Sequence, residues 1–296
     1  MWLFLLYFCF PRILKFMIKI NTIGNKYELS MGNNKVVIDS FGAKVLAFYQ
    51  GNDNRLYYSS DDISHSGIPL CFPNFGPLAN NEFCYNGKTY PIKQHGFVRN
   101  MNFDFVSKTD NTLVLELKSN SETLLQYPLE FSFRVSFILA KDEIKICFIW
   151  HNKSNKKAPI SPGVHPYFSV YDREGVVLQT NSLSYNLSAD FSEIEKVIGS
   201  EFLDAASQSS FIIKGAPDIN LINHNSENTS IMLGDNKSVN LKYSSLDFNR
   251  LTVWRKNASD DYICVEPANA QNKINNNPLL IDGGGIWESI VKIKFN

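Results

Sequence analysis

The sequence lacks the features that mark several large classes of protein. Across 296 residues, Lys+Arg and Asp+Glu both number 29, so the formal charge is zero and no basic stripe for phosphate backbones is visible. The 5 cysteines are odd in number and form no C-x-x-C pair, which indicates neither a disulfide framework nor a zinc knuckle. We therefore expect no nucleic-acid partner, and reduced thiols in a cytoplasmic protein.

Long apolar runs are also missing, apart from the beginning of the chain. Met1 to Phe10 is strongly apolar, but it has no basic n-region and runs directly into Pro11-Arg12. It is too short to span a bilayer. We interpret residues 1–16 as an extension outside the fold and expect a single domain over residues 17–296, with no stable membrane insertion. A poor signal peptide or a membrane tether is the alternative.

Several catalytic motifs do not occur in the sequence. There is no G-x-S-x-G elbow, no G-x-x-x-x-G-K-[ST] loop and no H-E-x-x-H pair. Each motif places a nucleophile, a phosphate cradle or a zinc ligand pair at a fixed spacing, so their absence argues against an esterase, a nucleotide hydrolase and a zincin.

What the chain has in abundance is alternation of apolar and polar residues. Phe131 to Leu139 alternates in this way, and Ile144 to Phe148 repeats the pattern after a turn-like segment, which predicts a hairpin. Similar runs occur at Val36 to Ile38, Leu113 to Leu117, Val176 to Gln179, Ile231 to Leu233, Leu251 to Trp254, Tyr262 to Val265 and Ile290 to Phe295. Helical periodicity is scarce, and the best case is a short piece near Phe191 to Ile198. The pattern predicts an all-β fold of antiparallel sheets packed face to face.

Two of the 5 histidines stand in constrained, apolar surroundings. His95 precedes a glycine and His165 precedes a proline, so the backbone can aim each side chain into a cleft. His151 and His224 lie beside polar loops and are expected to be solvated. A single histidine is more often structural than catalytic, so His95 and His165 gain weight only from what surrounds them.

Glu266 follows the apolar run Tyr262 to Val265 and precedes Pro267, which is expected to end the strand. A carboxylate there is costly unless it is hydrogen-bonded or faces a wet pocket. Partial desolvation would raise its pKa toward the range that suits a general base. The alternative is a glutamate at a strand end that reaches solvent.

Arg99 follows His95 in a loop with almost no other charge. Its guanidinium could donate two parallel hydrogen bonds to a ligand, or it could form an ordinary surface ion pair. A metal site made of His95, His165 and Glu266 is chemically possible, but these residues lack short ligand spacing, and we expect no metal.

Four segments, in order, resemble landmarks of the aldose 1-epimerase (galactose mutarotase-like) superfamily: Gly67 to Gly76, Gln94 to Arg99, His165 to Phe168 and Val265 to Pro267. The similarity runs from about Asn21 to the terminal strand. It is closest to the branch of bacterial aldose epimerase-like proteins and hexose-6-phosphate epimerases. Asn86 to Pro91, and Ser121-Glu122-Thr123 followed by Tyr127-Pro128, point to that branch. The resemblance implies one large antiparallel β-sandwich with a sugar cleft and with neither a metal nor an organic cofactor.

Carried over residue by residue, the resemblance makes Glu266 the general base, His165 the general acid, and His95, Arg99 and Asp218 the groups that hold the substrate. It implies an enzyme that interconverts the α and β anomers of a hexose or hexose 6-phosphate by acid/base ring opening. We expect a monomer or homodimer.

One departure affects the expected substrate. Many phosphate-acting relatives carry an arginine shortly before the Gly-Ile-Pro segment, where this chain has Ser64-His65-Ser66. His65 could partly substitute at low pH, with Lys93 and Arg55 nearby in sequence, but none is a secure phosphate ligand, which argues against a preference for a hexose 6-phosphate.

Two other functions fit the same fold. A carbohydrate-binding or regulatory protein would use the cleft without turning the sugar over, because fold does not imply function. Such a protein would not need both His165 and Glu266. A glycoside-cleaving enzyme would need two carboxylates across the scissile bond, and only Glu266 is well placed.

Overall fold

The structure, a computed structural model, describes residues 26–181, 184–187, 196–197, 203–207, 210–222, 228–269 and 273–296. The expectations for the N-terminal extension and for His224 lie outside these residues. Most of the helix expected near Phe191 to Ile198 also lies outside them, and its described part is wrong: Lys196–Val197 is strand β17. These two residues pair with the neighbouring strand β16, Ser184–Leu187, and this ladder overrides the weak helical periodicity.

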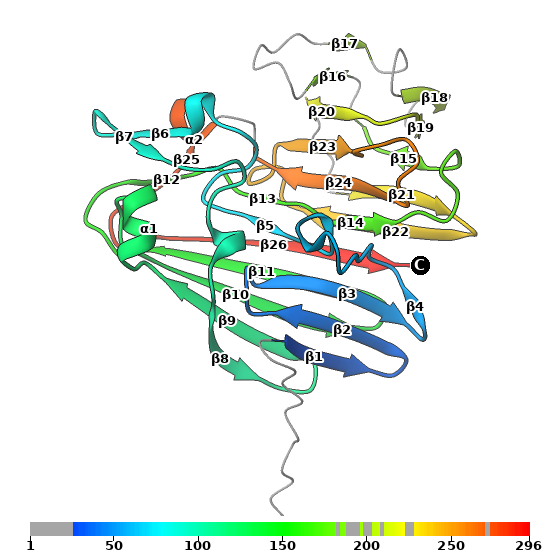
Figure 1. Ribbon diagram of the computed structural model, residues 1–296, viewed down its shortest axis with the longest axis horizontal. Helices are drawn as coiled ribbons and strands as arrows, with labels where there is room; N and C mark the ends of the chain where they lie inside the picture. The colour runs from blue at the N-terminus through cyan, green and yellow to red at the C-terminus, as the bar shows by residue number, and fades with distance from the viewer. Residues whose placement is uncertain are drawn as a thin grey trace, which may run out of the picture.

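Two large sheets form the body of the molecule (Figure 1). The larger runs in the order β18-β19-β15-β21-β22-β26-β11-β10-β9-β8. Its strands are β8 Asp104–Lys108, β9 Thr112–Lys118, β10 Phe131–Ala140, β11 Glu143–Asn152, β15 Val177–Gln179, β18 Leu203–Ser207, β19 Ser210–Ile213, β21 Asn228–Gly234, β22 Lys237–Tyr243 and β26 Ile286–Phe295. Every neighbouring pair is antiparallel.

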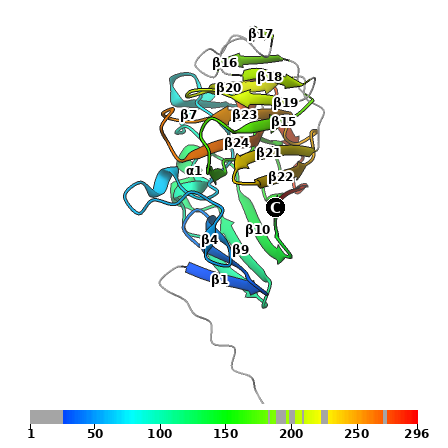
Figure 2. The ribbon, with the colours of Figure 1, turned by 90° about the vertical axis from the view of Figure 1, so that its right-hand side faces the viewer.

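The second sheet runs in the order β17-β16-β20-β23-β24-β13-β5, and β14 also pairs with β24. Its further strands are β5 Leu70–Cys71, β13 Gly163–Val164, β14 Tyr167–Ser169, β20 Asp218–Ile222, β23 Arg250–Trp254 and β24 Tyr262–Ala268. These pairs are antiparallel too. Seen edge-on in Figure 2, β23 and β24 lie against β15, β21 and β22 of the first sheet.

Smaller elements surround the two sheets. A four-stranded sheet holds β1 Lys26–Met31, β2 Asn34–Asp39, β3 Lys44–Gln50 and β4 Asp53–Asn54, and two-stranded ribbons hold β6 Glu82–Tyr85 with β7 Lys88–Pro91 and β12 Ala158–Ile160 with β25 Leu279–Ile281. The helical pieces are α1 Ser121–Gln126, α2 Lys273–Asn276 and the 3-10 turns η1 Ile63–His65, η2 Ala79–Asn81 and η3 Val98–Asn100. None of the helices in the described ranges has the length and apolar character needed to cross a membrane.

The predicted hairpin is confirmed as β10 and β11. Their residues alternate between buried and less buried along the whole length, because one face of the pair packs inward and the other does not. The chain reverses at Asp142, which takes a positive φ of 55°.

The core lies between the sheets and is rich in aromatic rings. The Phe72 and Phe133 rings lie 4.5 Å apart between the second sheet and the first. The Phe48 and Phe295 rings, 4.1 Å apart, join the four-stranded sheet to the ten-stranded one. The all-β sandwich expected from the alternation is therefore confirmed.

Strand β24 departs from the alternating pattern, because all of its residues are buried. Pro267 was expected to end this strand, and that prediction is wrong: β24 continues to Ala268. On one side β24 pairs with β14 at residues 262–264 and with β13 at Ala268, while Pro267 falls between the two partners. A proline there loses no ladder hydrogen bond on that side, so it is tolerated inside the strand.

Candidate active site

The floor of the candidate site is a block of side chains on three neighbouring strands, β20, β23 and β24. Asn220 lies opposite Thr252, and Thr252 lies opposite Glu266. Directly paired residues of an antiparallel sheet point to the same face, so the three side chains form one row. The alternate residues of these strands, Val253 and Val265 among them, belong to the core on the other face.

A second row lies two residues along the same strands. Asp218 is paired with Trp254, Trp254 with Cys264, and Cys264 with Tyr167 of β14. Residues two apart on a strand share a face, so this row lies beside the first one. The register of the sheet thus gathers residues from four segments that are far apart in the sequence.

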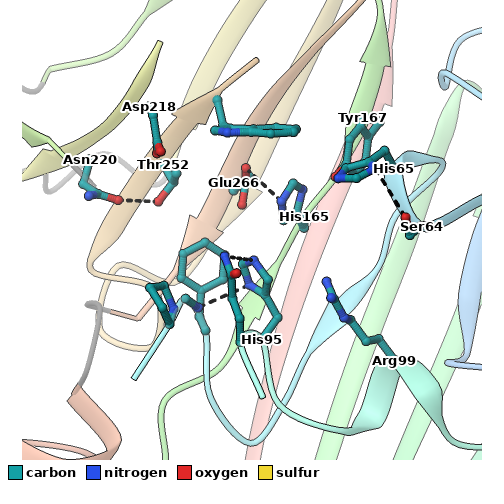
Figure 3. Close-up of a pocket in the computed structure, with 15 residues that line it drawn as sticks. Ser64, His65, His95, Arg99, His165, Tyr167, Asp218, Asn220, Thr252 and Glu266 are labelled. Carbon is teal, nitrogen blue, oxygen red and sulfur yellow. Dashed lines mark hydrogen bonds and ion pairs between the residues drawn. The ribbon is translucent and has the colours of Figure 1, made fainter. Parts of the chain in front are cut away.

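His165 enters the site from a break in a strand. It lies between β13 and β14, and together with Pro166 it separates two short strands that both pair with β24. Its ring is stacked on Tyr167, with centroids 4.8 Å apart and planes at 9°, and it meets Trp254 edge-on at 5.9 Å. Its Nε2 lies 3.4 Å from Oε1 of Glu266 (Figure 3). We call these two residues the His165–Glu266 pair.

His95 reaches the same site from the loop before η3. It has a positive φ of 65°, and Gly96 after it has a φ of 70°. A Cβ at Gly96 would lie 2.0 Å from the carbonyl oxygen of Phe72, so only glycine fits there. The two rings of His95 and His165 meet edge-on, with centroids 5.3 Å apart.

The tautomer of His95 follows from its contacts. Its Nδ1 accepts a hydrogen bond from the Gly76 backbone N–H at 3.2 Å. A neutral imidazole that accepts at Nδ1 carries its proton on Nε2. That nitrogen lies 3.1 Å from Nε2 of Gln94, which is also a donor, so the contact is a hydrogen bond only with the Gln94 amide turned to place its oxygen toward the ring. The Nε2–H of His95 is therefore a hydrogen-bond donor on the side of the ring that faces Gln94.

A cavity of about 410 Å³ joins these groups. This volume lies in the range typical of small-molecule sites. It is lined by Ser64, His65, Phe75, Gly76, Pro77, Gln94, His95, Arg99, His165, Tyr167, Asp218, Asn220, Thr252, Trp254 and Glu266. Arg99, held on η3, points into the cavity in Figure 3 and forms no ion pair with any described residue.

The His165–Glu266 pair is almost completely withdrawn from solvent. Glu266 is 1% exposed, and among the described atoms neither of its carboxyl oxygens has a hydrogen-bond partner. Burial, with the charge of Asp218 as a smaller contribution, raises the pKa of Glu266 well above its ordinary value. Burial, with His95 and Arg99 as smaller contributions, lowers the pKa of His165 well below its ordinary value. The two shifts oppose the ordinary order, in which imidazole is the stronger base.

His95 is shifted in the same direction as His165. Burial, and to a smaller extent the charge of Arg99, lowers the pKa of His95 to about 3. His95 is therefore neutral at neutral pH and acts there as a fixed hydrogen-bonding group.

The structure brings all five site residues expected from the sequence into this one cavity: His95, Arg99, His165, Asp218 and Glu266. Sequence reasoning gave no site role to Asn220, Thr252 or Trp254, which also line it. The spacing of Asp218 to Asn220 and of Thr252 to Trp254 would have placed each pair on one strand face. That spacing, however, does not determine which strands pair with one another.

The residues considered as substitutes for a phosphate-binding arginine fare differently. His65 lines the cavity, where its Nδ1 is within hydrogen-bond distance of Oδ2 of Asp62 at 2.7 Å and its ring stacks on Trp254. Arg55 is 2% exposed and donates to the backbone oxygens of Ser238 and Asn296, away from the cavity lining. Lys93 is exposed and does not line the cavity.

Comparison with known proteins gives one family. The model of a family described as aldose 1-epimerase matches residues 25–279. The chain is 25% identical over 228 residues to the chromosomal protein LacX of Lactococcus lactis subsp. lactis, covering 72% of this chain and 76% of that protein.

Solved structures agree on the fold. The Slr1438 protein of Synechocystis sp. PCC 6803 superposes with a TM-score of 0.81 at 23% identity, covering 92% of this chain and 95% of that chain. A galactose mutarotase related enzyme of Lactobacillus acidophilus superposes with a TM-score of 0.80 at 22% identity, covering 92% of this chain and 97% of that chain. A putative aldose 1-epimerase of Escherichia coli K12 superposes with a TM-score of 0.74 at 16% identity, covering 92% of this chain and 98% of that chain.

Proposed function

The chain belongs to the aldose 1-epimerase family, and from that membership we propose that it interconverts the α and β anomers of a hexose by acid/base ring opening. One observation carries the proposal: an imidazole and a carboxyl group lie 3.4 Å apart in a polar cavity that would hold a monosaccharide. The two oxygens that must exchange protons in the reaction, the anomeric hydroxyl and the ring oxygen, are both bonded to C1. A pair this close can serve both.

The reaction needs the pair to hold one proton. Glu266, as carboxylate, takes the proton of the anomeric hydroxyl while His165, as imidazolium, protonates the ring oxygen, and the bond from C1 to the ring oxygen breaks. The products on the protein are a neutral carboxylic acid and a neutral imidazole. After rotation about C1 to C2, the same transfers in reverse close the ring as the other anomer. The proton count of the pair is the same before and after.

The electrostatics of the pair support this cycle. Burial favours the neutral acid and neutral imidazole, because both charged forms are desolvated. The raised pKa of Glu266 and the lowered pKa of His165 both act against the ordinary order, in which imidazole binds its proton more tightly. Each placed proton-transfer group is worth roughly 10²- to 10⁴-fold.

The other cavity residues would hold the sugar. Thr252 donates its hydroxyl proton to Oδ1 of Asn220 at 2.7 Å, so the Thr252 oxygen is left as an acceptor for a sugar hydroxyl. His95 and Arg99 would act as donors, and Asp218, which is exposed at the rim, as an acceptor. Trp254 lines the cavity beside these groups, with its ring stacked against His65.

The experiment is anomer exchange, followed by polarimetry or NMR, with glucose, galactose and their 6-phosphates. We expect the protein to speed the exchange of at least one pure anomer. If every sugar in the panel exchanges at the spontaneous rate, the protein does not act as an epimerase on these hexoses, and binding without turnover becomes the better account. The ratio of rates between each sugar and its 6-phosphate also decides whether the cavity accepts a phosphate.

A further inference from the structure

A cysteine lies directly beside the His165–Glu266 pair. Cys264 is two residues before Glu266 on β24, so both side chains point to the same face. One donor atom each from His165, Cys264 and Glu266 lie within 4.8 Å of one another, and all three residues are buried. Cys264 itself does not line the cavity, and the proposed epimerase reaction leaves it without a role.

The donor atoms of this cluster are short of protein partners. Neither oxygen of Glu266 nor Nδ1 of His165 has a hydrogen-bond partner among the described residues. Nε2 of His165 and Oε1 of Glu266 are separated by 3.4 Å. Two ligands of one tetrahedral zinc ion, each about 2.0 to 2.2 Å from the metal, lie roughly 3.3 Å apart. Nε2 of His165 and Oε1 of Glu266 therefore already have the separation of two ligands of one zinc ion.

We propose that His165, Cys264 and Glu266 bind one divalent cation of borderline softness, of which Zn²⁺ is the representative, and that the bound ion blocks the site. Thiolate and imidazole ligands select Zn²⁺ and similar ions over Mg²⁺ and Ca²⁺, which take oxygen ligands. Three protein ligands leave the fourth tetrahedral position open to the cavity. The thiol of Cys264 loses its proton to solvent as the ion binds, because the thiolate is the ligand.

The bound ion would inhibit the anomer exchange. Binding occupies the lone pairs on Glu266 and His165 that would accept protons from the sugar, so the metal and the reaction exclude each other. This set also differs from the His95, His165 and Glu266 set considered from the sequence, since Cys264 takes the place of His95. The blocking of turnover rests on the proposed function, whereas the binding of the ion does not.

Binding is tested without any sugar, by titrating the full chain with Co²⁺ as a spectroscopic substitute for Zn²⁺. We expect one ion per chain, with the intense near-ultraviolet band of a cobalt–thiolate bond and the visible bands of tetrahedral Co²⁺, both removed by added Zn²⁺. In Cys264→Ala the thiolate band should disappear and the affinity should fall at least about tenfold, as for loss of a metal-supporting group.

The matched control is Cys84→Ala, which removes an exposed cysteine remote in sequence and should keep the band. Cys264→Ser, which preserves the shape of the side chain, guards against misfolding of the alanine variant and should also lose the band. The proposal is overturned if the wild type gives no thiolate band, if the band survives in both Cys264 variants, or if it disappears in Cys84→Ala.

A second arm measures anomer exchange with and without equimolar Zn²⁺. We expect the wild-type rate to fall at least tenfold and to recover with a chelator, and Cys264→Ala to lose much less of its own metal-free rate. Equal inhibition of both proteins would overturn the assignment of Cys264 as a ligand. A wild type without any exchange activity would refute the epimerase proposal, while the cobalt spectrum would still decide the cation site.

Discussion

Strands β10 and β11 and strands β23 and β24 are both antiparallel pairs in large sheets, yet they bury their residues differently. In β10 and β11 every second residue is buried, and the residues between are partly exposed. In β24 both faces are buried: Ile263 and Val265 face the core, while Cys264 and Glu266 lie on the other face, where Glu266 lines the cavity. The first pair uses burial for stability. The second also uses it to remove water from two groups that can exchange protons.

The difference lies in what burial costs. Burying Phe137 of β10 is favourable, because apolar surface leaves water and no polar group loses a hydrogen bond. Burying Glu266 without a hydrogen-bond partner among the described residues is unfavourable, and the group that lies beside it is the His165 ring, 3.4 Å away. A buried carboxyl of this kind lowers stability, and pKa values shifted by burial are common at catalytic sites. Substitutions in the two regions should therefore separate stability from activity.

The largest effect is expected for Glu266→Gln. The rate of anomer exchange should fall by roughly 10²- to 10⁴-fold, because the amide cannot accept the anomeric proton. The free energy of unfolding at pH 7 should be no lower than that of the wild type. Since the pKa of Glu266 is raised, burying this carboxyl opposes folding at pH values above its ordinary pKa. A variant that loses stability and activity together would erase the contrast between the two regions.

Phe137→Ala in β10 is the converse experiment. The ring is fully buried, and its loss should lower the free energy of unfolding by about 3 to 5 kcal/mol. The exchange rate per folded molecule should stay unchanged. Arg134→Ala, at an exposed position of the same strand, is the control and should shift stability by less than about 0.5 kcal/mol. Urea denaturation measures the first quantity, and a large loss of activity in folded Phe137→Ala would contradict the account.

The free energy of unfolding should depend on pH through the buried His95. The pKa of His95 is about 3 in the folded protein and ordinarily 6.5, so below pH 6.5 the unfolded chain binds a proton that the folded chain does not. The contribution of His95 to the free energy of unfolding is fully present above pH 6.5. It falls by about 1.4 kcal/mol per pH unit as the pH drops toward 3. His165 acts in the same direction.

His95→Gln should therefore flatten the loss of unfolding free energy between pH 6.5 and pH 4.5, measured by urea denaturation at each pH. His151→Gln, at a half-buried histidine on β11 that does not line the cavity, is the matched control with which the slope of His95→Gln is compared. Equal slopes for the wild type and His95→Gln would contradict the burial of a neutral imidazole in the site.

The smallest effect is expected for Thr252→Val, which keeps the shape of the side chain and removes the oxygen that faces the cavity. One lost hydrogen bond of about 0.5 to 1.5 kcal/mol should lower kcat/KM by up to about tenfold. Thr252→Ser should retain most of the activity, because it keeps the hydroxyl that donates to Asn220. If valine and serine behave alike, Thr252 does not hold the sugar through its oxygen.

Much of the β10–β11 region could be predicted from the sequence, and much less of the β24 region. Alternation places Phe131 to Leu139 on a one-sided strand without any knowledge of its neighbours. For Glu266 the sequence predicts a place at the end of a strand, because Pro267 follows it. The switch of pairing from β14 to β13, which lets Pro267 remain in the strand, depends on tertiary contacts.

The meeting of the site residues could be expected only through the family resemblance. Cross-strand register brings Asn220, Thr252 and Glu266 into one row, and register is set by pairings between segments distant in sequence. Thr252 and Trp254 look like ordinary members of a strand until those pairings are known. The glycine at position 96 was a stronger local signal, since the turn there requires a positive φ.

The central claim is that His165 and Glu266 act as one unit that holds a single proton. Anomer exchange measured for the wild type, Glu266→Gln, His165→Asn and the double variant tests it most directly. Groups that act as a unit are strongly non-additive, so the double variant should be about as slow as either single variant. If the two losses multiply, or if either single variant keeps the wild-type rate, the pair does not work together in this reaction.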